Sequence, residues 1–195
     1  MIVHATELPG VSVIELQPLR DPRGSFTRTF DAELFAAHGL DPRVAQCSAS
    51  FNPHAGTLRG LHYQAPPHEE SKLVRCVRGR VWDVVVDLRP DSSAYCRWLG
   101  IELDADGMRL LSVPEGCAHG FQTLLDDSQV DYQMSVAYVP EAAAGVRWDD
   151  PAFAIDWPEP PRGGERIIST RDRAFADYAR SDGARSDSTL SHHAP

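Results

Sequence analysis

Between residues 44 and 139 the chain consists of short runs of alternating apolar and polar residues, separated by turn residues. In residues 81–88, for example, the even-numbered positions are apolar and share one face of an extended chain, while Asp83 and Asp87 lie on the other. Such alternation is typical of an antiparallel sheet with one face in the core. Many short strands and few helices predict an all-β protein, either a sandwich or a jelly roll.

Only a few short helices are expected. Residues 31–38 have helical character, with Asp31 as the N-cap and Gly39 as the stop. A second short helix is predicted over residues 170–180. Residues 181–195 are small and polar, so we expect a disordered tail there and a single domain over residues 1–180.

Composition limits the partners and the compartment. The chain has 195 residues, 42% of them hydrophobic, which is enough for one closed core. A net charge of -9 argues against nucleic acid and anionic membranes as partners. The four cysteines form no CxxC pair, and no apolar run approaches the ~18 residues of a membrane span. We therefore predict a reduced, cytoplasmic protein.

Arg59 and His62 are the first candidates for a functional site. On a regular strand they would point to opposite faces, so a shared site requires either a bulge at Gly60 or a regular strand that starts after it. The pair would then suit anion binding and proton transfer beside a carbonyl. The alternative is a half-buried histidine beside a surface arginine.

Lys72 and two tyrosines follow at strand positions. Lys72 has apolar neighbours on its face, so it either meets an anionic group or extends its ammonium into water at the strand mouth. Tyr132 and Tyr138 have equal parity and would lie about 20 Å apart on one strand face, roughly the reach of a nucleotide sugar. They could equally be ordinary aromatic residues of a sheet.

Pro114, Gly116 and His119 resemble the second motif of the cupins. The usual downstream asparagine is absent, although Gln122 stands nearby. Residues 62–64 read His-Tyr-Gln, which lacks the His-x-His pair of the first motif. Because a metal needs at least three well-placed ligands, we predict a cupin barrel without a metal.

Taken together, these segments resemble the dTDP-4-dehydrorhamnose 3,5-epimerases from about residue 1 to 172. The matching parts are residues 21–24, 58–64, 72–76, 83–89, 114–121, 148–151, 157–158 and 169–172, with Tyr132 and Tyr138. The resemblance implies a jelly-roll (cupin) barrel, usually a homodimer. It also implies an epimerase that needs no cofactor and acts on a nucleotide-linked 4-keto-6-deoxy sugar.

The resemblance also implies roles for individual residues. His62 would remove a proton α to the C4 ketone, and Asp172 would orient it. Tyr132 would return a proton from the opposite face, while Lys72 would stabilise the enolate oxygen. The implied substrate-binding residues are Arg59, His119 and Arg171 on the diphosphate, Tyr138 on the base, Arg23 from across the dimer, and Gln46 and Ser48.

Three positions depart from the family pattern. Arg28, Ser48 and Ala143 stand where the family usually has glutamate, asparagine and glutamate, respectively. The chemistry is therefore better supported than the choice of substrate, and a related epimerase acting on a CDP- or GDP-linked sugar is an alternative. A 3,4-ketoisomerase, a non-catalytic cupin that binds sugar nucleotides, and a metal-dependent cupin enzyme are further alternatives.

Overall fold

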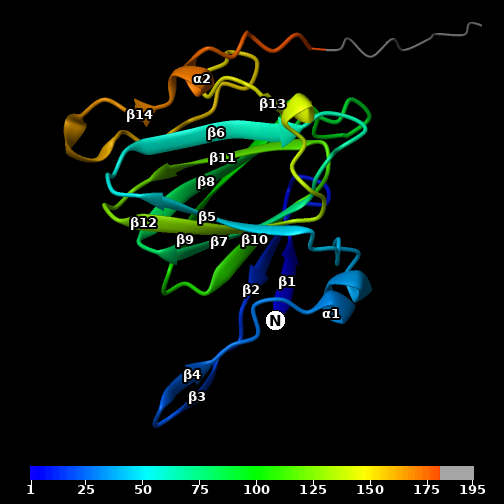
Figure 1. Cartoon of the computed structure of the whole chain (residues 1–195), viewed down its shortest axis with the longest axis vertical. Helices are drawn as coiled ribbons and strands as arrows, with labels where there is room; N and C mark the ends of the chain where they lie inside the picture. Colours follow the sequence, from blue (N-terminus) through cyan, green and yellow to red (C-terminus); the bar gives the residue numbers. More distant parts are fainter. Residues whose placement is uncertain (181–195) are drawn as a thin grey trace, which may run out of the picture.

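Two β-sheets face each other in the computed structural model, which describes residues 1–180 (Figure 1). The first sheet has the strand order β1-β2-β10-β7-β12-β5, and the second has the order β13-β6-β11-β8-β9, with β14 pairing in parallel to β6. The fourteen strands are β1 Ile2–Ala5, β2 Ser12–Glu15, β3 Leu19–Asp21, β4 Gly24–Phe26, β5 Gln46–Asn52, β6 Thr57–Gln64, β7 Lys72–Arg78, β8 Arg80–Asp87, β9 Trp98–Asp104, β10 Arg109–Val113, β11 Cys117–Thr123, β12 Ser128–Met134, β13 Ala143–Gly145 and β14 Ile167–Ile168. The prediction of an all-β jelly-roll barrel of the cupin type is confirmed.

The space between the sheets is filled by apolar side chains from both walls. Val74 and Val130 come from the first sheet, and Val85, Leu103 and Phe121 come from the second. All five are essentially inaccessible to solvent. Burial of this set supplies the main apolar stabilisation of the barrel.

The expectation that only the apolar face of strand β8 lies in the core is wrong. Its apolar face, with Val84 and Val86, packs on the outside of the second sheet against the C-terminal segment, including Phe153 and Trp157. Its aspartate face, with Asp83, lies on the same side as Val85 and points into the barrel. Both faces of this strand are buried, so alternation did not distinguish the inside from the outside.

Helix α1, Ala32–Ala37, covers the outer face of the first sheet. The Asp31 side chain accepts a hydrogen bond from the backbone N–H of Leu34, which confirms the predicted cap. Phe35 is buried with Ile14 and Leu73 beneath the helix. Before it, β3 and β4 form a hairpin that projects away from the barrel (Figure 1), and every residue in its two strands is exposed.

Residues 146–180 cross the outer face of the second sheet and include the short helix α2, Thr170–Arg173, drawn above β6 in Figure 1. This helix is shorter than predicted. Two single-turn 3-10 segments lie at Pro140–Ala142 and Pro161–Gly163. The predicted tail at residues 181–195 lies outside the described residues. No helix in the described part is long and apolar enough to cross a membrane.

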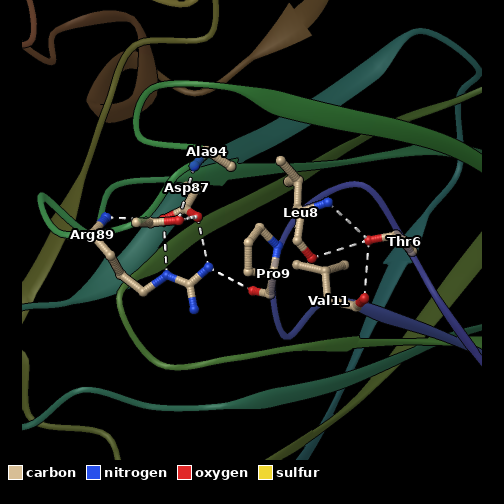
Figure 2. Close-up of polar contacts among 8 residues, drawn as sticks. Thr6, Leu8, Pro9, Val11, Asp87, Arg89 and Ala94 are labelled. Atoms are coloured by element: carbon tan, nitrogen blue, oxygen red, sulfur yellow. Dashed lines mark hydrogen bonds and ion pairs between the residues drawn. The ribbon is translucent and has the colours of Figure 1, made fainter.

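The C-terminal end of β8 is tied to the N-terminal loop by a buried charge network (Figure 2). The fully buried carboxylate of Asp87 accepts hydrogen bonds from the guanidinium of Arg89 at 2.8 and 2.6 Å and from the hydroxyl of Ser92 at 2.6 Å. The same guanidinium donates to the carbonyl of Pro9 at 2.6 Å. Because the buried charge is paired and hydrogen-bonded, it fixes the loop rather than destabilising the fold.

Candidate active site

A bulge in β6 brings Arg59 and His62 to the same face. Cross-strand partners are His119 for His62 and Phe121 for Arg59, so two residues of β6 oppose one residue of β11. Gly60 has a φ of +124°, and a Cβ there would lie 2.6 Å from the Cα of Gly120. Only glycine fits this position, and of the two arrangements expected from parity the structure has the bulge.

His62 forms a hydrogen-bonded pair with Asp172 of helix α2. The His62 Nε2–Asp172 Oδ1 distance is 2.8 Å, and the other carboxylate oxygen accepts the backbone N–H of Gly60 at 3.2 Å. Ser169 caps the helix by accepting the Asp172 N–H at 3.0 Å. Burial acts to raise the pKa of Asp172, but the bonds from His62 and Gly60 outweigh it, and the net pKa is lowered. A charged Asp172 leaves Nδ1 as the imidazole atom that can accept a proton.

Lys72 is buried at the start of β7. Its Nζ donates to the carbonyl oxygen of His62 at 2.9 Å and lies 3.0 Å from Oε1 of Glu70. The lysine side chain is only 9% exposed, which excludes the alternative of an ammonium reaching into water. Burial lowers the pKa of Lys72, while the charges of Glu70 and Asp83 oppose that effect.

Asp83, His119 and Tyr132 form a second polar group in the interior. The His119 Nε2–Asp83 Oδ1 distance is 2.7 Å, and the histidine and tyrosine rings meet edge to face at 6.0 Å. Oδ2 of Asp83 has no hydrogen-bond partner among the described residues, and burial raises the pKa of this carboxyl group. Burial, followed by the charge of Asp83, raises the pKa of Tyr132, while Arg59 opposes the shift. The phenol therefore stays protonated over the usual range.

The imidazole of His62 and the phenol of Tyr132 come from opposite walls of the barrel. His62 belongs to β6 of the second sheet, and Tyr132 belongs to β12 of the first. His62 shares the inner face with its cross-strand partner His119, whose ring contacts that of Tyr132. A planar carbon held between them could lose a proton to one wall and gain a proton from the other.

Strand β5 places two further predicted residues at the sheet edge. Gln46 and Ser48 are exposed, and Ser48 lies directly opposite Tyr132. The side-chain oxygen of Gln46 accepts the backbone N–H of Tyr138. The expectation that both tyrosines share one strand is wrong, because β12 ends at Met134 and Tyr138 lies in the loop beyond it, 53% exposed.

Of the three arginines predicted to bind substrate, two lie near His62 and one does not. The guanidinium of Arg59 donates to the side chain of Asn52 at 2.7 Å. Arg171 is on α2 and stacks on Phe175, whose ring edge contacts His62 at 6.1 Å between centroids. Arg23 is at the tip of the β3–β4 hairpin, paired with Asp21, and does not join the cluster within its own chain.

Two of the family departures have local structural roles. Arg28 pairs with Asp31 at 2.6 Å, next to the cap of α1. Ala143 lies on β13 opposite Gln64. Within residues 1–180, no three His, Cys, Asp or Glu side chains are grouped as a metal site.

Three residues of the site were not predicted from the sequence: Glu70, Asp83 as the partner of His119, and Phe175. Asp83 was visible as a polar residue of a strand, but its inward direction was not. Glu70 comes from the β6–β7 loop and Phe175 from the segment after α2. No periodic signal marks such positions.

Comparison with known proteins places this chain in a family. The family model for dTDP-4-dehydrorhamnose 3,5-epimerase matches residues 5–180. The enzyme of that name from Methanothermobacter thermautotrophicus is 42% identical over 86% of this chain and 89% of its own. A crystal structure of the Bacillus anthracis enzyme with TDP and PPi bound has a TM-score of 0.85 at 35% identity, covering 91% of this chain and 99% of that one. A Streptomyces bikiniensis 3'-monoepimerase in complex with dTDP-quinovose has a TM-score of 0.80 at 32% identity, covering 89% and 86%.

Proposed function

This chain belongs to the dTDP-4-dehydrorhamnose 3,5-epimerase family, and on that premise we propose that it converts dTDP-4-dehydro-6-deoxyglucose to dTDP-4-dehydrorhamnose. The reaction inverts C3 and C5, the two carbons that flank the C4 ketone. The observation that carries this assignment is the placement of His62 and Tyr132 on opposite walls, with the Lys72 ammonium buried beside them. This arrangement suits inversion, which needs a base and an acid on opposite faces of one carbon.

His62 begins the reaction by accepting the proton of the carbon next to the ketone. The electron pair of the broken C–H bond moves into the ring, and the C4 oxygen gains negative charge as the enolate forms. Asp172 carries negative charge and stabilises the imidazolium that results. Tyr132 then gives its hydroxyl proton to the carbon from the other face, which inverts the centre. The imidazolium of His62 releases its proton to solvent and the phenolate takes one up, so that both groups return to their starting states.

Lys72 stabilises the enolate oxygen in this scheme. Charge develops at the C4 oxygen whichever carbon loses its proton, so a single ammonium serves both inversions. The buried position of Lys72 strengthens this interaction, because little water competes with it. No metal is needed for the charge to be held.

The nucleotide diphosphate would bind beside His62. Arg59 and Arg171 supply positive charge near His62, one from β6 and one from α2. Tyr138 offers an exposed ring for stacking on the base. The relatives reported above are epimerases of dTDP sugars, which favours this function over a ketoisomerase, a non-catalytic binding protein or a CDP- or GDP-specific enzyme.

The working unit is proposed to be a cytoplasmic homodimer. Arg23 projects on an exposed hairpin and is absent from the cluster of its own chain, so a partner subunit is where it can meet substrate. Exposed Leu19 and Phe26 on the same hairpin, at 73% and 72%, would be covered in such a dimer. Light scattering that gives a monomer mass would contradict this arrangement.

Incubation of the substrate with enzyme in D₂O tests the function directly. We expect deuterium at both C3 and C5 by NMR and formation of the inverted sugar, with no exchange by His62→Ala. Deuterium at C3 alone would identify a monoepimerase, and exchange at neither carbon would refute the proposal. Thermal-shift measurements with dTDP, CDP, GDP and UDP would compare the nucleotides, since the tightest ligand raises the melting temperature most.

A further inference from the structure

We propose that Glu70 is a positioning residue for this reaction, which holds the Lys72 ammonium charged and aimed at the oxygen where the enolate forms. The inference rests on the proposed function, and in particular on the part assigned to Lys72. Glu70 itself lies in the β6–β7 loop and is not assigned any contact with substrate.

The geometry fixes the ammonium from two sides. Nζ of Lys72 is 3.0 Å from the Glu70 carboxylate and 2.9 Å from the carbonyl oxygen of His62. An ammonium group has three N–H donors, so two are used by the protein and one is left for a substrate oxygen. Because one of the two acceptors is the backbone of His62, the ammonium is placed at a set distance from the residue that acts as base.

Burial makes the carboxylate of Glu70 necessary. The side chains of Lys72 and Glu70 are 9% and 10% exposed. Without Glu70, the buried lysine would lose its proton more readily than a lysine in water. Removing one partner of such a pair leaves an uncompensated charge in a medium of low dielectric. The pKa of Lys72 is lowered by burial, and the contribution of Glu70 is the largest of those that oppose the shift.

The other groups around Lys72 do not replace Glu70. Asp83 is the second carboxylate that favours the charged lysine, but it is hydrogen-bonded to His119 and burial raises its pKa. The phenol of Tyr132, on the neighbouring strand β12, and the imidazole of His62, on the opposite sheet, carry no negative charge in the starting state. Among the described residues Glu70 has no ion pair except the one with Lys72.

The test compares pH profiles of kcat/KM for the full-length enzyme and its Glu70→Gln, Glu70→Asp and Glu69→Gln variants. Glu69 is the matched control, because it is the neighbouring glutamate and has no ion pair within residues 1–180. In Glu70→Gln the lysine loses its proton at lower pH, so the alkaline limb shifts to lower pH. Activity at pH 8 should fall by about 10- to 100-fold, less than the loss of a complete oxyanion donor, and the deficit should shrink as the pH is lowered.

Three outcomes separate the two proposals. A wild-type enzyme without C3 or C5 exchange would refute the proposed function itself. An active wild type with an unmoved alkaline limb in Glu70→Gln would overturn the part given to Glu70 and leave the function standing. If Glu70→Gln does not fold, the Glu70→Asp variant provides the test. Its shorter side chain holds the carboxylate farther from Lys72, so the alkaline limb of the kcat/KM profile should lie at lower pH than in the wild type. An alkaline limb at the wild-type pH overturns the inference.

Discussion

Replacement of Asp172 by asparagine tests the proposed base more directly than removal of the imidazole. The two side chains have the same size, and the remaining carbonyl oxygen can still accept the Gly60 N–H. The amide nitrogen of asparagine, however, is a hydrogen-bond donor, so Nε2 of His62 must be unprotonated to accept its hydrogen bond. The proton then sits on Nδ1, and the ring can no longer accept a proton from the substrate.

The expected loss follows from the bond that the substitution removes. The His62–Asp172 hydrogen bond is 2.8 Å long and involves a charged acceptor, a class of bond that contributes about 1.5–3 kcal/mol. That alone corresponds to a loss of roughly 10- to 150-fold in rate, since each 1.36 kcal/mol is tenfold. Inversion of the tautomer removes general-base catalysis as a whole, which contributes about 10²- to 10⁴-fold and includes the contribution of this bond. We expect kcat to fall by about 10²- to 10⁴-fold.

Deuterium exchange at C3 and C5, followed by NMR, measures this loss. Binding of dTDP should be unchanged within a few-fold, because Asp172 faces His62 and not the substrate. Asp177→Asn is the matched control, since Asp177 pairs with Arg147 at the surface, where an ion pair contributes little. An Asp172→Asn enzyme that is folded and retains kcat within about threefold of wild type would refute the reasoning.

Three further changes have defined outcomes. Tyr132→Phe should reduce epimerisation by about 10²-fold or more while C–H exchange falls less, because only return of the proton from the opposite face is lost; equal losses in both NMR assays would contradict that division. Gly145→Ala would place a methyl group 2.3 Å from the Phe175 ring, so we expect thermal unfolding to show a loss of about 1–3 kcal/mol. Burial opposes ionisation of Asp87, but the hydrogen bond from Arg89 and the other hydrogen bonds to this carboxylate lower its net pKa. The charged Asp87 therefore stabilises the fold at pH values above the pKa of the unfolded chain, and this stabilisation is lost as the pH falls through the pKa of the folded protein. Asp87→Asn should therefore lower the unfolding free energy by about 1–3 kcal/mol at pH 7 and by less near pH 3, as measured in urea.

Local steric rules predicted several details correctly. The parity of Arg59 and His62 required an interruption at Gly60, and the structure contains the bulge at that residue. Asp31 was predicted as a helix cap because its short acceptor can reach the first free N–H groups, and it does so. Such features depend on a few adjacent residues, so the sequence contains all the information they require.

Features that depend on distant segments were not predictable in the same way. The inner face of β8 carries Asp83, because the C-terminal segment supplies an apolar cover for the other face. Periodicity cannot show that a strand is covered on both sides. Tyr138 lies beyond the strand in which it was predicted, because β12 ends at Met134. Glu70 was missed since its importance comes from a partner in the fold and not from its neighbours in sequence.

The order of synthesis has a consequence for when this enzyme becomes active. Strand β6 leaves the ribosome early, but the carboxylate that orients its imidazole is carried by α2, 110 residues later. A nascent chain, or one clipped before residue 169, contains His62 without the carboxylate that is hydrogen-bonded to it. In the proposed mechanism the catalytic pair is therefore complete only once α2 has docked beside β6.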